Sequence, residues 1–339
     1  MTTMRDVAKE AGVGLGTVSR VLNESPLVSD VTRQRVLRVI KELNYVPNQL
    51  ARRLSLGKTL TVAAVLPFFT RPAFSERLNG VASALARTHY DLLIHNIDTP
   101  ELRRNFFENL LPHEVADGML VLSLPLFDEE AEYLLRQVDI PLVLIDSSHP
   151  RMEGEVHQLS VDDVAGGRLA TQHLLDLGHT RVGFVGDLVD NPFNFKSSRE
   201  RYQGYCEALE AAGIPQRAAY YAAGQHGRRQ ARTLAKEMLA VEERPTAIFA
   251  ASDTQAVGVL EAARSLNLRV PEDLSVVGYD DIELADIMRL TTVRQMLFEA
   301  GQRSVEILLK ALKDPQMAIV HEELSLELVV RESTAKPGG

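Results

Sequence analysis

The chain of 339 residues has no tryptophan, one cysteine (Cys206) and only 6% aromatic residues. A single cysteine excludes an internal disulfide, which fits a reducing compartment. No apolar run approaches the roughly 18 residues that indicate a membrane-spanning helix. The N-terminus also lacks the basic region followed by an apolar core that marks a signal peptide. We therefore expect a cytoplasmic protein with no membrane partner.

The formal net charge of −9 hides an uneven distribution of charge along the chain. Residues 1–60 contain ten basic and five acidic side chains, whereas the rest of the chain contains 27 basic and 41 acidic ones. A basic head on an acidic body is typical of a nucleic-acid-binding domain fused to a different domain. The chain is also longer than a typical domain with a single hydrophobic core, so two or three domains are expected.

Three short helices are predicted near the N-terminus. Thr3 can cap the first helix, with Asp6 reaching back to it, and Gly12 can end it. A second helix is predicted after Gly14, and Ser29 can cap a third. Two short helices joined by a tight turn form a helix-turn-helix when the second exposes small polar groups and an arginine. The residues expected to face inward are Val7, Ala8, Ala11, Val18, Val21, Leu22, Val36, Val39, Ile40 and Leu43.

A short basic segment follows the third helix. Asn48 can cap a helical segment over residues 49–56, which carries Arg52, Arg53 and Leu54. A helix this short is marginal in water on its own. An apolar side chain flanked by arginines suits insertion into a minor-groove base step, so we expect this hinge to fold when DNA holds it.

These motifs carry a family resemblance. The N-terminal segment resembles that of the lactose-repressor (LacI/GalR) family of bacterial transcription regulators, and the resemblance continues to the end of the chain. In this segment it is carried by residues 4–13, 17–23, 45–48 and 51–54. It implies an all-α helix-turn-helix head with a hinge helix, joined to a two-lobed α/β body of doubly wound parallel sheets, like a periplasmic binding protein. It also implies a homodimer on a pseudo-palindromic operator in double-stranded DNA.

The resemblance also implies which residues contact DNA. Leu15 and Gly16 occupy the positions that read operator bases, and Leu54 occupies the position of an intercalating leucine. The Leu15-Gly16 pair has almost no hydrogen-bonding capacity, which shifts specificity toward apolar contact with thymine methyl groups and toward DNA deformation. The predicted DNA-binding residues are Arg5, Leu15, Gly16, Thr17, Ser19, Arg20, Asn23, Asn48, Ala51, Arg52 and Leu54.

Short apolar runs alternate with amphipathic stretches from Leu60 onward. The alternation predicts βαβ units and parallel sheets, and the segment is too long for one sheet, so two lobes with a cleft are expected. The predicted strands are 61–66, 91–94, 118–122, 142–145, 181–185, 247–250 and 275–279, and the resemblance implies a last strand within 327–334.

The predicted domain limits follow from these patterns. The head spans 1–46, the hinge and linker 47–59, the body 60–334 and a tail 335–339. Within the body, the N-lobe is expected at about 60–160 plus 291–318, and the C-lobe at about 161–290 plus 319–334.

Polar residues directly after the predicted strands are candidates for a ligand site, because ligands of such sheets bind at the carboxyl ends of strands. An arginine among several carboxylates suits a ligand rich in hydroxyl groups, through charge-assisted hydrogen bonds. Simpler roles exist for some of them: Asp163 and Asp253 as helix caps, and Asp162 and Asp281 as turn residues. The candidates are Asp146, Asp162, Asp163, Asp187, Ser252, Asp253, Asp280 and Asp281, with Arg201 at the start of a helix.

The resemblance narrows this set. Arg201, Ser252 and Asp280 match effector-binding positions, and His226 stands where many members place a stacking aromatic ring. Phe193 and Phe195 are candidates for the missing apolar wall, or alternatively for pinning a loop. The predicted effector-binding residues are Phe74, Asp146, Phe193, Arg201, His226, Ser252 and Asp280.

The sequence thus predicts a transcription repressor controlled allosterically by a sugar or sugar phosphate, with a nucleobase as the alternative ligand; both directions of control stay open. No cofactor, metal ligand or catalytic residue is expected. A solute-binding protein would share the two-lobed body but not the basic head. A glycosidase is disfavoured because adjacent aspartates do not provide two carboxyls that flank a bond.

Overall fold

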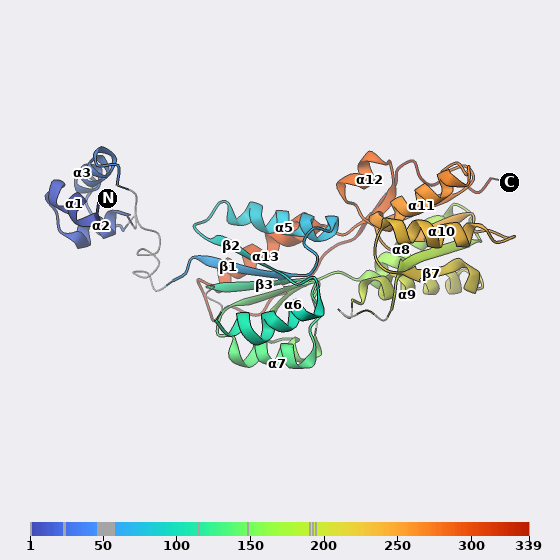
Figure 1. Cartoon of the computed structure of the whole chain (residues 1–339), viewed down its shortest axis with the longest axis horizontal. Helices are drawn as coiled ribbons and strands as arrows, with labels where there is room; N and C mark the ends of the chain where they lie inside the picture. Colours follow the sequence, from blue (N-terminus) through green and yellow to red (C-terminus); the bar gives the residue numbers. More distant parts are fainter. Residues whose placement is uncertain are drawn as a thin grey trace. The chain divides into compact units, whose positions relative to one another are not determined.

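The computed structural model describes residues 2–22, 25–45, 58–113, 116–147, 149–189, 191, 193 and 195–338. These residues belong to two units, Met1–Leu60 and Thr61–Gly339, which are described separately (Figure 1). None of the described helices combines the length and the apolar character needed to cross a membrane.

The N-terminal unit contains the three expected helices, α1 (Met4–Glu10), α2 (Leu15–Leu22) and α3 (Asp30–Glu42). Thr3 and Asp6 form the predicted capping box, in which the Thr3 backbone N–H donates to the Asp6 carboxylate at 2.8 Å. Ser29 caps α3. All ten residues expected to face inward belong to the small core or pack against it, so the prediction of a three-helix head is confirmed.

The first lobe of the second unit has a sheet in which every pairing is parallel. Its strand order is β11-β5-β4-β3-β1-β2. The strands are β1 (Thr61–Leu66), β2 (Asp91–Asn96), β3 (Gly118–Leu122), β4 (Leu142–Ile145), β5 (His157–Ser160) and β11 (His321–Glu323). The helices are α5 (Pro72–Leu85), α6 (Pro100–Asn105), α7 (Asp128–Gln137) and α13 (Leu297–Ala311), with single turns at Phe106–Leu110, Leu111–His113 and Pro150–Met152.

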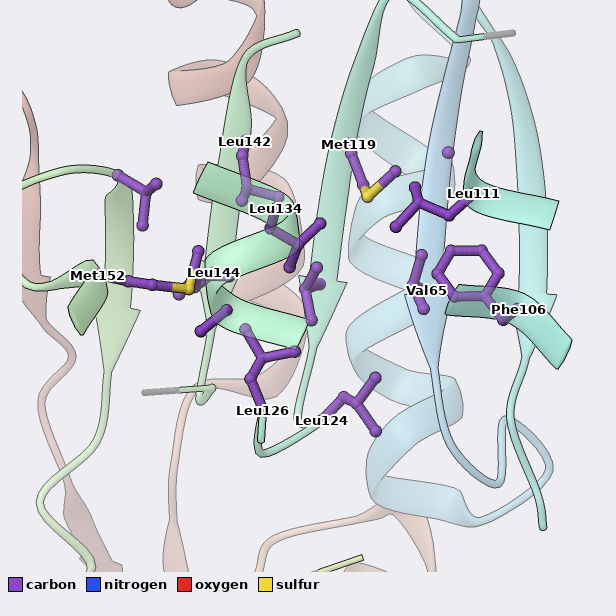
Figure 2. Packing of buried hydrophobic residues seen from close by; sticks show 14 of the residues in the cluster. Val65, Phe106, Leu111, Met119, Leu124, Leu126, Leu134, Leu142, Leu144 and Met152 are labelled. Carbon is purple, nitrogen blue, oxygen red and sulfur yellow. The ribbon is translucent and has the colours of Figure 1, made fainter. Parts of the chain in front are cut away.

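Both faces of the central strands β1, β3 and β4 are buried, because alternate residues of each of these strands enter different apolar clusters. Figure 2 shows Val65, Met119 and Leu144 from adjacent strands in one cluster with Phe106 and Leu134. Intervening strand residues pack instead with α5 and α13 on the opposite face. Burial on both faces explains why these strands read as continuous apolar runs in the sequence.

The second lobe repeats the arrangement, with strand order β12-β10-β9-β8-β6-β7 and only β12 antiparallel. Helices α8 and α9 pack together, as do α10 and α11. The strands are β6 (Val182–Asp187), β7 (Tyr221–Gly224), β8 (Ala247–Ala250), β9 (Ser275–Asp280), β10 (Thr291–Arg294) and β12 (Glu327–Val329). The helices are α8 (Asp163–Asp176), α9 (Ser197–Ala211), α10 (Arg228–Leu239), α11 (Asp253–Ser265) and α12 (Glu283–Ile287), with a turn at Ala218–Tyr220.

Strand pairing corrects the expected division between the lobes. Strand β10 pairs with β9 of the second sheet, so the chain enters the first lobe after Arg294 rather than at 291. Strand β11 pairs with β5 of the first sheet, so the chain leaves that lobe after Glu323 rather than at 319. Both strands were missed because they are short and mostly polar, and neither carries an apolar run.

Helices α8 and α9 cross at glycines. A Cβ atom on Gly204 would lie 2.0 Å from the Val164 carbonyl oxygen, and one on Gly167 would lie 2.1 Å from the Arg201 carbonyl oxygen. The two backbones therefore approach too closely for any side chain at these positions. This crossing places Arg201 of α9 beside the N-terminus of α8.

The crossing generates a stability prediction. Gly204→Ala should lower the free energy of unfolding by about 1–3 kcal/mol, because the added methyl group overpacks the α8–α9 contact. Urea unfolding followed by circular dichroism measures the effect. The control Glu210→Ala changes an exposed residue of the same helix and should leave stability within about 0.5 kcal/mol. Equal stability of both variants would contradict the close crossing.

Candidate ligand pocket and DNA-contact helix

The N-terminal unit exposes one face of α2. Leu15 is 43% exposed while Val18 and Val21 of the same helix are buried. Of the other predicted DNA contacts, Arg5, Gly16 and Arg20 are exposed, and Thr17 and Ser19 are partly exposed. Asn23, Asn48, Ala51, Arg52 and Leu54 lie outside the described residues. The described part of this α2 face presents one apolar side chain, the backbone of a glycine, two hydroxyl groups and one guanidinium group, and α1 adds the guanidinium group of Arg5.

A pocket between the lobes contains six of the seven predicted effector-binding residues. They come from the first turn of α5, from the ends of β4 and β9, from the loop after β7, from α9 and from the cap of α11. The carboxyl ends of the strands thus bring these residues together, as expected for such sheets. In chain order they are Phe74, Asp146, Arg201, His226, Ser252 and Asp280.

Phe193 is the predicted residue that does not line the pocket. It is 4% exposed, belongs to the apolar cluster of the first lobe and has its ring centroid 5.0 Å from that of Phe68. Phe195 lines the pocket instead, with its ring 6.3 Å from that of Phe74. Of the two roles left open for these phenylalanines, Phe193 fits loop pinning and Phe195 fits the apolar wall.

Arg201 is a buried cation of the pocket, with 7% of its surface exposed. Its Nε donates to Asp163 at 2.8 Å, and one terminal nitrogen donates to the Ala251 carbonyl at 2.6 Å and lies 3.8 Å from Asp280. The guanidinium carbon also lies 3.7 Å from the centroid of the Tyr279 ring. Residues from α8, β9 and the end of β8 therefore hold this one side chain.

Burial and charge shift the acid–base equilibria of this cluster. Burial alone would lower the pKa of Arg201, but Asp163, Tyr279 and Asp280 outweigh it and raise that pKa. Burial raises the pKa of Asp280 to about 6, although Arg201, Gln295 and His226 act in the opposite direction. Burial also raises the pKa of Asp163 against the effect of Arg201. The cluster is therefore a charged site held together by mutual pairing.

Two further pocket residues, Arg77 and Gln295, were missed by the sequence analysis. Gln295 donates to Asp280 and accepts from a terminal nitrogen of Arg77 at 3.4 Å. Arg77 also donates to Ser123 and lies 3.4 Å from Asp146. A chain of polar contacts thus runs from the second lobe to the first. Neither residue ends a predicted strand, so no sequence signal separated them from ordinary surface residues.

A second set of contacts orients Asp187 at the end of β6. His226 Nδ1 lies 3.2 Å from both carboxylate oxygens of Asp187, and the Gln255 amide donates to one of them at 2.9 Å. Gln255 is held in turn by the Ser252 hydroxyl. The pocket wall thus presents carboxylate, imidazole and amide groups with fixed orientations.

The expected helix caps are displaced by one residue each. Asp162, not Asp163, caps α8, and its carboxylate accepts from the Ala165 N–H at 2.8 Å. Ser252, not Asp253, caps α11. Asp163 is therefore free to pair with Arg201. Asp253 is buried and accepts from the Thr292 hydroxyl at 2.6 Å and from the Ile282 N–H at 3.0 Å. Asp281, expected as a turn residue, pairs with Arg294 and Arg331.

Within the described residues, no group of three or more histidine, cysteine, aspartate or glutamate side chains is arranged to hold a metal ion. The pocket geometry is that of a binding site: oriented donors and acceptors with aromatic rings on one wall.

Comparison with known proteins gives two family matches. Residues 3–48 match the model for bacterial regulatory proteins of the lacI family, and residues 171–334 match that for a periplasmic binding protein-like domain. The repressor PurR of Vibrio vulnificus (strain CMCP6) is 34% identical, with 99% of each chain covered. The ribose operon repressor of Escherichia coli (strain K12) is also 34% identical, with 98% of this chain and 100% of that chain covered.

Solved structures agree with these matches. The lac repressor dimer bound to operator and the anti-inducer ONPF is 28% identical, with a TM-score of 0.82 and coverage of 98% of this chain and 99% of that one. A complex of the transcriptional regulator CelR with cellobiose is 32% identical, with a TM-score of 0.71 and coverage of 98% and 100%. The expected fold, a helical head on a two-lobed α/β body, is confirmed.

The raised pKa of Asp280 generates a pH prediction. A carboxyl whose pKa rises from 3.8 to about 6 on folding destabilises the folded state progressively as the pH increases through that interval. Asp280→Asn removes this pH-dependent destabilisation and keeps an oxygen that accepts from the Gln295 amide. The stability of the variant relative to the original protein should therefore rise between pH 3.8 and about 6, and level off above.

Urea titrations of both proteins at several pH values measure this difference, with Asp314→Asn, an exposed aspartate, as the control. A stability difference that is independent of pH across the interval would contradict the raised pKa of Asp280.

Proposed function

We propose that this chain, a DNA-binding repressor that belongs to the lacI family of bacterial regulatory proteins, is controlled by a small hydroxyl-rich molecule, a sugar, bound between its lobes. The observation that carries the proposal is the pocket's ring of oriented polar groups: Asp146, Arg201, Asp280 and Gln295. A sugar hydroxyl both donates and accepts, so it can satisfy a carboxylate and a guanidinium that lie side by side.

The aromatic wall supports the same ligand class. Phe74 and Phe195 lie on one side of the pocket, and the charged cluster supplies the polar side. A sugar ring has an apolar C–H face and a hydroxyl-bearing edge, so it matches both surfaces at once. Among the similar proteins, CelR binds cellobiose and another is the repressor of a ribose operon.

The DNA side of the function rests on the head. Its exposed α2 face presents Leu15, Gly16 and Arg20, which we assign to operator bases and phosphates. The similar lac repressor binds its operator as a dimer, and we propose the same assembly here, with half-sites related by two-fold symmetry. Operator DNA as the partner also places the repressor in the cytoplasm.

Linkage between the two sites needs no chemistry. The contacts from Asp280 through Gln295 and Arg77 to Asp146 connect the lobes. A ligand that replaces or reinforces these contacts changes the relative free energies of lobe arrangements, and operator affinity changes by the same coupling free energy. The curated relatives named above are repressors, and we assign no catalytic residue.

The alternative, a solute-binding protein without DNA regulation, shares the periplasmic binding protein-like body but not the helical head. The match of residues 3–48 to the lacI-family model and the confirmed three-helix head favour the repressor.

The proposal is tested by titrating the full-length protein onto its own upstream DNA with and without a panel of sugars, sugar phosphates and nucleobases. We expect specific binding at moderate salt that a sugar shifts at least tenfold. The panel also gives the direction of control. Specific DNA binding that no sugar or sugar phosphate changes would overturn the proposed effector class.

A pocket variant separates the two sites. Asp146 has φ = 50°, a conformation that asparagine tolerates, so Asp146→Asn should preserve the fold. Loss of a charged acceptor should raise the effector concentration for half-maximal response about tenfold, whereas operator affinity without effector should change less, because the asparagine oxygen can still accept from Arg77. Fluorescence anisotropy on labelled operator measures both quantities. A change in operator affinity without effector that is larger than the change in effector response would contradict a main role of Asp146 in ligand binding.

Leu54→Ala tests the proposed wedge. The substitution should weaken binding to the operator more than binding to unrelated DNA, because insertion into a base step matters only where the DNA bends. Affinities for both DNAs at one salt concentration decide the matter, and an equal loss on both would rule the wedge out.

A further inference from the structure

We infer that the effector carries a negatively charged group, a phosphate ester or a carboxylate, that binds between Arg71 of the first lobe and Lys196 of the second. This inference rests on the proposed function and deepens it by naming the charge class of the ligand. Both residues line the pocket, and both are half-buried.

Arg71 contacts a small aromatic group, and Lys196 directly follows one member of that group in the chain. The guanidinium carbon of Arg71 is 3.7 Å from the centroid of the Phe68 ring. That ring is 6.2 Å from the ring of Phe195, which immediately precedes Lys196. Neither Arg71 nor Lys196 forms an ion pair with a carboxylate among the described residues. Burial lowers the pKa of Arg71, although Asp187 and Asp98 act on it in the opposite direction. A partly desolvated cation with no carboxylate in direct contact favours an anionic ligand.

Both cations stand at helix N-termini. Arg71 is the N-cap of α5 and Lys196 the N-cap of α9, and neither helix has a side-chain cap. Pro72, Ala73 and Phe74 of the first turn of α5 line the pocket, and so does Ser197 of α9. Free backbone N–H groups and the positive ends of helix dipoles favour anions, and a basic N-cap adds to that preference.

A third, buried cation in the same pocket is incompletely satisfied. Arg77 is 3% exposed, and its Nε has no hydrogen-bond partner in the described part of the chain. A buried N–H without an acceptor costs about 1–3 kcal/mol, and an anionic oxygen that draws the guanidinium toward it would recover this cost.

The carboxylates of the pocket do not cancel these cations, because most are already engaged. Asp146 contacts Arg77, Asp163 and Asp280 contact Arg201, and Asp187 contacts His226. Glu200 is the exception. Burial, with Asp163 and Asp146, raises the pKa of Glu200 and so favours its neutral form, in which it can donate to a ligand oxygen.

The test uses inorganic phosphate as the probe on the full-length protein. Thermal unfolding is followed as phosphate replaces chloride at constant ionic strength. We expect saturable stabilisation by phosphate, and the double variant Arg71→Gln with Lys196→Gln should bind phosphate at least tenfold more weakly. Arg199→Gln, an exposed arginine of α9 outside the pocket lining, is the matched control and should behave like the original protein.

Calorimetry then compares a neutral hexose and a neutral pentose with their phosphate esters and aldonic acids. The charged derivatives should bind at least tenfold more tightly than the neutral sugars, and the double variant should lose this preference. A phosphate ester that binds more tightly than the aldonic acid identifies phosphate as the group, and the reverse identifies carboxylate.

The outcomes separate this inference from the proposed function. Absence of phosphate stabilisation, or equal stabilisation of the original protein and the double variant, overturns the anionic site. The anionic site is also overturned if a neutral sugar binds as tightly as its charged derivatives and shifts operator affinity. In that case the proposed function remains supported. Phosphate binding that depends on Arg71 and Lys196, without any sugar effect on operator binding, supports the anion site and defeats the proposed effector class.

Discussion

The buried guanidinium of Arg201 is the interaction on which the second lobe and the pocket both depend. A charge removed from water is tolerated only if it is paired and hydrogen-bonded, so the residues that surround it are fixed in position. Asp163, Asp280 and the Ala251 carbonyl come from three different elements and meet at this one side chain. The close crossing of α8 and α9 at their glycines brings Arg201 within reach of these three acceptor groups. The same constraint therefore folds the lobe and shapes its ligand site.

From Asp280 the polar contacts continue through Gln295 and Arg77 into the first lobe. These groups form hydrogen bonds and ion pairs with one another. A ligand that enters must replace such contacts with bonds of its own, and its net effect is the difference between the two sets. This exchange is a physical basis for control by a small molecule, because the contacts that compete with the ligand are also the contacts that join the lobes.

The sequence predicted the parts of this molecule whose signal is local. The seven apolar runs all became strands, six of them inside the sheets and one, β2, at a sheet edge, and the Thr3 and Ser29 caps formed as expected. Strands β5, β7, β10 and β11 escaped detection because they are short and carry few large apolar side chains. The family resemblance predicted six residues that line the pocket. Gln295 and Arg77 line it as well, but only long-range packing brings them there. Phe193 and Phe195 have similar sequence contexts, and only the fold places one in the core and the other in the pocket wall.

Selectivity among ligands must arise from the groups that the protein itself leaves unsatisfied. Arg201 is paired with Asp163 and Asp280, so these groups distinguish little between one hydroxyl-rich ligand and another. Arg71 and Lys196 have no carboxylate partner among the described residues, and exchanging solvent for an anion there costs no internal ion pair. For the proposed ligand we therefore infer that the paired centre of the pocket sets the general class, and that Arg71 and Lys196 discriminate within it. On the DNA side, α2 exposes a leucine and a glycine, and neither residue has a side chain that can form hydrogen bonds with base edges.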